Sequence, residues 1–127
     1  MNIEKVVFGF FIVLSLTLNF GFVLGEIDNP AHHNVIEMFV VVLVNLIAMG
    51  LKLGDRSQIG ALLLATSIVA VLQLVAAALV WTVAVHVTGT GLVPEVMASI
   101  VSLASGAMLA NIISVVLLVG ETLISRR

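Results

Sequence analysis

The fold of this chain follows from residues 59–87, which read IGALLLATSIVAVLQLVAAALVWTVAVHV. This stretch contains no Asp, Glu, Lys or Arg, and it exceeds the roughly 20 residues that a helix needs to cross a bilayer. It shows no alternation of polar and apolar residues, which argues against a strand. A continuous helix satisfies its own backbone hydrogen bonds inside lipid, so the stretch is predicted to be a transmembrane helix.

Three further apolar stretches of similar length flank this one, at residues 6–25, 30–53 and 94–125. Polar turns separate the four stretches, and Pro30 and Pro94 each suit the first turn of a helix. The sequence therefore predicts an all-α, polytopic membrane protein with four transmembrane helices in an up-down bundle, forming one domain.

The first stretch has an alternative interpretation as a secretory signal peptide. Lys5 would be its basic region, and residues 23–25 resemble a cleavage site with small residues. The stretch is long for the apolar part of a signal peptide, so we favour a transmembrane helix.

The overall composition agrees with lipid as the main solvent. Of the 127 residues, 61% are hydrophobic and 9% are charged, whereas a soluble domain carries about 25% charged residues. A net charge of −2 provides no basic surface for nucleic acid. The absence of cysteine excludes disulfides, thiolate metal sites and cysteine nucleophiles, and no phosphate-binding or catalytic motif occurs, so neither a cofactor nor an enzymatic activity is predicted.

The basic residues predict the orientation in the membrane. All five fall before the first helix, between the second and third, or after the fourth: Lys5, Lys52, Arg56, Arg126 and Arg127. Basic residues are enriched in cytoplasmic segments, so both termini are predicted to lie in the cytoplasm.

Each predicted helix carries a carboxamide side chain within the membrane: Asn19, Asn45, Gln73 and Asn111. Such groups are unfavourable against lipid and are expected to face other helices. They would either bond across helix contacts or line a polar pathway for an ion, water or a small solute. No carboxylate or basic residue lies near the middle of a predicted helix, which argues against a proton pump or a voltage sensor.

A second polar feature is the acidic and histidine-rich cluster between the first two helices. If the second helix starts at Pro30, His33 and Glu37 share one face and form a candidate cation site with Glu26 and Asp28, while His32 turns away. The alternatives are a solvated loop and a pH-sensing group.

At the cytoplasmic side, Glu121 near the end of the fourth helix is expected to form a structural ion pair. Its candidate partners are Lys52, Arg126 and Lys5.

The whole chain resembles small four-helix inner-membrane proteins of bacteria that form a family of unknown function. The resemblance rests on residues 28–34 (DNPAHHN), residues 51–56 (LKLGDR) and the region around Gln73. It implies a location in the bacterial inner membrane and no particular activity.

Two functions remain open from the sequence. The first is a small homo-oligomeric channel or transport subunit for ions or small solutes, with a pore between subunits. The alternative is an accessory or scaffold subunit that packs against a larger membrane protein. An intramembrane enzyme is disfavoured, because neither a histidine nor a carboxylate lies mid-membrane beside a nucleophile.

Overall fold

The computed structural model describes residues 3–125 of the chain. Its four α-helices are α1 (Ile3–Val23), α2 (Val35–Lys52), α3 (Gln58–Thr82) and α4 (Pro94–Ser125). A short 3-10 helix, η1 (Pro30–His32), precedes α2, and a π-helical segment, η2 (Val83–Val87), continues α3. All four α-helices are long and apolar enough to cross a membrane, so the chain is a multi-pass membrane protein.

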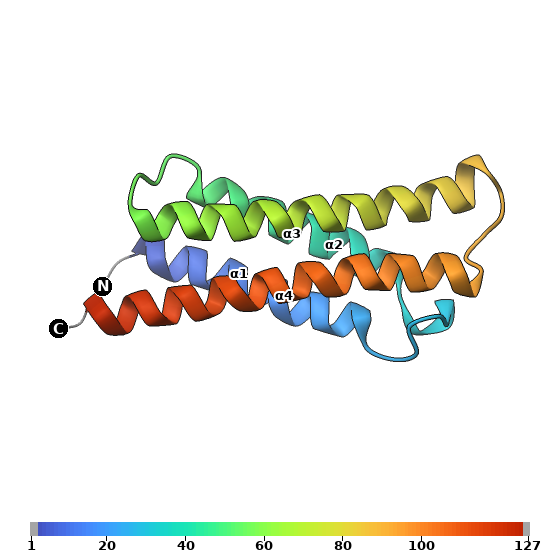
Figure 1. Ribbon diagram of the computed structural model, residues 1–127, viewed down its shortest axis with the longest axis horizontal. Helices are drawn as coiled ribbons and strands as arrows, with labels where there is room; N and C mark the ends of the chain where they lie inside the picture. Colours follow the sequence, from blue (N-terminus) through green and yellow to red (C-terminus); the bar gives the residue numbers. More distant parts are fainter. Residues whose placement is uncertain (1–2, 126–127) are drawn as a thin grey trace.

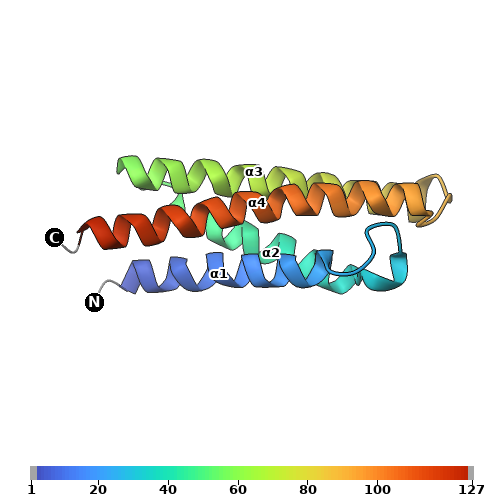
Figure 2. The ribbon, with the colours of Figure 1, turned by 60° about the horizontal axis from the view of Figure 1, so that its bottom comes forward.

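The helices lie side by side, and consecutive helices run in opposite directions (Figure 1). Each helix packs against two neighbours: α1 and α3 each contact both α2 and α4. The beginning of α1 and the end of α4 lie at the same end of the bundle, which we call the terminal end (Figure 2). The α1–α2 and α3–α4 connections lie at the opposite end, the loop end.

The predicted helices are confirmed, with differences at their boundaries. The fourth has the predicted bounds, but α2 begins at Val35 rather than at residue 30. Asn29 caps only the short helix η1, accepting a hydrogen bond from the Ala31 N–H at 3.0 Å. Asn34 then caps α2 by accepting from the Ile36 N–H at 2.7 Å. The third predicted helix changes to π geometry after Thr82.

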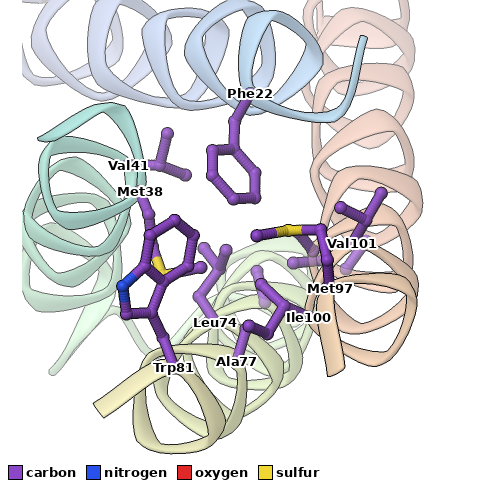
Figure 3. Packing of buried hydrophobic residues seen from close by; sticks show 13 residues of the cluster. Phe22, Met38, Val41, Leu74, Ala77, Trp81, Met97, Ile100 and Val101 are labelled. Atoms are coloured by element: carbon purple, nitrogen blue, oxygen red, sulfur yellow. The ribbon is translucent and has the colours of Figure 1, made fainter. Parts of the chain in front are cut away.

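Large apolar side chains from all four helices fill the bundle near the loop end (Figure 3). We call four of them the loop-end plug: Phe22 of α1, Met38 of α2, Trp81 of α3 and Met97 of α4. All four are buried, and the rings of Phe22 and Trp81 lie 6.5 Å apart between centroids. The four side chains close the interior of the bundle toward the loop end.

A second, separate apolar cluster lies near the terminal end. Its buried members, the terminal-end plug, are Phe8 and Ile12 of α1, Ala48 of α2 and Leu63 of α3. Leu118 of α4 packs against them. The core of the bundle is thus divided into two apolar parts.

Candidate functional site

Polar side chains from every helix lie in the interior between the two plugs, where small apolar residues such as Ala70 and Ala107 are also buried. We call this set the polar belt: Ser15 and Asn19 of α1, Asn45 of α2, Ser67 and Gln73 of α3, and Asn111 of α4. Gln73 is partly buried, and the other five are at most 1% exposed. The belt therefore lies inside the bundle and away from lipid.

The belt residues face inward because they occupy the same helical stripes as the plugs. On α1 the buried stripe runs through Phe8, Ile12, Ser15, Asn19 and Phe22, at spacings of three or four residues. The two polar residues replace apolar ones in the middle of this stripe. The same order of apolar, polar and apolar residues recurs on α2, α3 and α4.

Contacts at the terminal end place Ser15 and Asn111 at the same level. Lys5 Nζ lies 2.7 Å from Glu121 Oε2, which joins the start of α1 to the end of α4. Ser15 is ten residues beyond Lys5, and Asn111 is ten residues before Glu121. Because the two helices are antiparallel and rise equally per residue, these side chains lie at about the same height.

The same reasoning brings α2 to this level. Lys52 Nζ lies 4.4 Å from the centroid of the Phe8 ring. Ser15 is seven residues beyond Phe8, and Asn45 is seven residues before Lys52, so the two face each other across the α1–α2 contact.

A contact between α3 and α4 places Ser67 near the same level of the bundle. The hydroxyls of Thr66 and Ser114 are hydrogen-bonded to each other, so Ser67 lies within about one helical turn of Asn111. The belt thus has a layer with a polar residue from every helix. Asn19 and Gln73 lie about 6 Å further toward the loop end.

Most polar atoms of the belt have unused hydrogen-bonding capacity. The unpartnered buried atoms are Oδ1 and Nδ2 of both Asn19 and Asn111, Oδ1 of Asn45, Oγ of Ser67 and Oε1 of Gln73. Each such atom costs about 1–3 kcal/mol if it stays unpaired. A hydrogen-bond partner for these atoms would recover this free energy.

The carboxamides do not join the helices in this arrangement. Among residues 3–125, no hydrogen bond runs from Asn19, Asn45 or Asn111 to another helix, and Asn45 Nδ2 donates to Val41 O of its own helix at 2.9 Å. The interhelical bond at this depth is that between Thr66 and Ser114. As they are placed, the amides of Asn19, Asn45 and Asn111 thus make no bond across a helix contact.

His33 has a structural position that the sequence did not indicate. Its ring is buried at the loop end, with Nδ1 2.6 Å from Phe22 O and Nε2 2.7 Å from Glu26 O. His33 thereby ties the end of α1 to the segment that leads to α2.

The four residues of the predicted cation site, Glu26, Asp28, His33 and Glu37, do not form a ligand group in the structure. No set of three or more His, Asp or Glu side chains in residues 3–125 is placed to hold a metal ion. The helical pairing of His33 with Glu37 was wrong, because α2 begins only at Val35 and the His33 ring turns inward to backbone carbonyls. Of the two adjacent histidines, His32 is the exposed one, and its Nδ1 accepts the Glu26 N–H at 2.8 Å.

At the terminal end, two ion pairs surround a small pocket. Of the partners considered for Glu121, the structure gives Lys5, whereas Lys52 pairs with Asp55 at 3.5 Å. The third candidate, Arg126, lies outside the described residues. The Ser57 hydroxyl and backbone N–H both donate to Asp55 Oδ1, at 2.7 and 2.9 Å, and these hydrogen bonds hold the pKa of the Asp55 carboxyl below its ordinary value.

Comparison with known families matches residues 32–122 to a model described as "Family of unknown function (DUF6394)". The chain belongs to the DUF6394 family. The resemblance to a family of unknown function is therefore confirmed. The DUF6394 match includes the belt residues of α2, α3 and α4, while α1 precedes it. No curated protein and no solved structure matches the chain.

Proposed function

We propose that this DUF6394 protein binds a small polar solute in the polar belt and allows it to cross the membrane. The observation that carries the proposal is the layer of buried, unpartnered amide and hydroxyl atoms between two apolar plugs. A site that binds a solute at mid-membrane and is closed on both sides has the basic arrangement of a transport pathway.

The route from the terminal end is short. A pocket of about 160 Å³ lies among Lys5, Lys52, Asp55 and Glu121, and it reaches Leu63 of the terminal-end plug. Ser67 of the belt is one helical turn beyond Leu63. A solute that enters this charged pocket therefore has a single apolar layer to cross before it meets the belt.

The route from the loop end passes the loop-end plug, in which two of the four side chains are methionines. Met38 and Met97 have flexible, unbranched side chains that fill irregular space and change rotamer with little strain. Movement of these two side chains is a smaller rearrangement than displacement of a helix. We therefore place the gate at the loop end at Met38 and Met97.

This proposal differs from a pore between subunits. The amides that such a pore would need are buried within one bundle, so the pathway is proposed to run through each bundle. We propose that the terminal end lies in the cytoplasm, which the distribution of basic residues favours, and that the membrane is a bacterial inner membrane, which the family resemblance implies. A homo-oligomer would then carry several parallel pathways.

Reconstitution into liposomes tests the proposal. Asn45→Leu and Asn111→Leu replace belt amides by apolar side chains of similar size, and each is expected to abolish the solute flux of the wild-type protein. Ser102→Leu is the matched control, because Ser102 is exposed on the lipid-facing side of α4. If no solute or ion in a broad panel crosses faster than in protein-free liposomes, the proposal is wrong and the accessory-subunit role is favoured.

A further inference from the structure

We infer that the solute of the polar belt is uncharged and carries both hydrogen-bond donors and acceptors, as water, urea and small amides do. This inference rests on the proposed function and names its substrate class. Three features of the structure support it: the mixture of polar atoms in the belt, the distance of the belt from charged residues, and the composition of the plugs.

The first feature is the mixture of donors and acceptors. The unpartnered atoms are five oxygens, from four amides and one hydroxyl, and two amide nitrogens, the Nδ2 groups of Asn19 and Asn111. A cation would bond the oxygens and leave the N–H groups unpaired, and an anion would do the reverse. A neutral solute with both kinds of group bonds to all of them. The belt is therefore complementary to a neutral donor and acceptor.

The second feature is the absence of a counter-charge. None of the belt residues is ionisable, and the nearest charged residues along α2 are Lys52 and Glu37, about 10 and 12 Å of helix away from Asn45. Lys52 is already engaged with Asp55 and with the Phe8 ring. An ion in the belt would lose its hydration with no opposite charge close by, whereas a neutral solute loses much less.

The third feature is the composition of both plugs. At the loop end a solute must pass the loop-end plug and the large aliphatic side chains buried with it, which are Val41, Leu74, Ile100 and Val101; at the other end it must pass Phe8, Ile12 and Leu63. Apart from the indole N–H of Trp81, they offer no polar group. A hydrated ion would have to shed its water at each plug, while a small neutral molecule passes an apolar constriction at a lower barrier.

The experiment compares two classes of solute on the same proteoliposomes. Stopped-flow light scattering measures urea and water permeability, and dye-loaded vesicles of the same preparation measure K⁺ and Na⁺ flux. We expect urea permeability several-fold above that of protein-free vesicles, with ion flux at the protein-free level. Asn111→Leu and Asn45→Leu should each return urea permeability to background, and Ser102→Leu should leave it unchanged. Thermal melting of each variant verifies that it is folded.

The outcomes separate the inference from the proposed function. K⁺ or Na⁺ flux that the belt variants abolish would overturn the neutral-solute inference and leave the pathway through the belt intact. Urea flux that the belt variants do not change would overturn both, and so would the absence of any flux. Because Asn45 and Asn111 lie on different helices, failure of one variant to fold leaves the other to decide.

Discussion

Replacement of His33 by phenylalanine gives the sharpest prediction for the stability of the bundle. His33→Phe keeps a ring of similar size in a site that is 3% exposed, but it removes the two groups that bond Phe22 O and Glu26 O. Each bond contributes about 0.5–1.5 kcal/mol, and leaving the buried Phe22 carbonyl unpaired costs about 1–3 kcal/mol. The expected loss is about 2–4 kcal/mol in the free energy of unfolding.

The assay is unfolding of the purified protein in mild detergent by added denaturing detergent, followed by circular dichroism. Hydrogen exchange of residues 24–34 should also become faster, because the ring no longer ties this segment to α1.

The neighbouring histidine provides the control. His32 is exposed; its Nδ1 accepts the Glu26 N–H, and its Nε2 lies 3.4 Å from Asn29 Nδ2. Because both contacts are exposed to solvent, His32→Phe is expected to cost at most about 1 kcal/mol. Equal losses for the two variants, or no loss for His33→Phe, would refute the role assigned to the His33 ring.

Three further predictions concern other parts of the bundle. Gly25→Ala should destabilise the protein by more than about 1 kcal/mol in the same assay, because Gly25 has φ of 98° and an added Cβ would lie 2.7 Å from the His32 ring. Asn111→Leu should leave the melting temperature unchanged or raise it, since it removes two unpaired buried atoms; a large decrease would show that Asn111 is bonded in the native state. Ser57 lowers the pKa of Asp55 in the folded protein, so the ionised Asp55 carboxylate stabilises the fold at neutral pH, and this stabilisation is lost below about pH 4. In Asp55→Asn the melting temperature should therefore fall slightly less steeply toward acid pH than in the wild-type protein. An unchanged pH profile would contradict this.

The architecture could be predicted from sequence because it depends on composition over long segments. Four apolar stretches of sufficient length determine the number of helices, and no tertiary information is needed to find them. The buried positions of Asn19, Asn45 and Asn111 were also predictable, since a carboxamide facing lipid is unfavourable. That Asn45 and Asn111 share one level, with Asn19 about 6 Å further toward the loop end, depends on the register between helices, which a single sequence does not reveal.

The loop-end segment shows where sequence reasoning failed. The Asn29–Pro30 pair is typical of a helix start, but only the three residues of η1 follow it. Asn34 is an equally good N-cap. His33, which lies between Asn29 and Asn34, is not helical and turns its ring inward to Phe22 O, so α2 begins at Val35. Ser67 was missed for a different reason: one serine in a long apolar stretch carries no sign that it is buried inside the bundle.

The polar belt is tested most directly by solid-state NMR of the protein in lipid bilayers, with nitrogen labels on the asparagine side chains. Without added solute, the Nδ2 protons of Asn19 and Asn111 should show magnetisation transfer from water. When labelled urea is added, they should show transfer from urea. If these protons instead correlate with acceptors on neighbouring helices and receive no transfer from water or urea, the belt is a closed structural element and does not bind a solute.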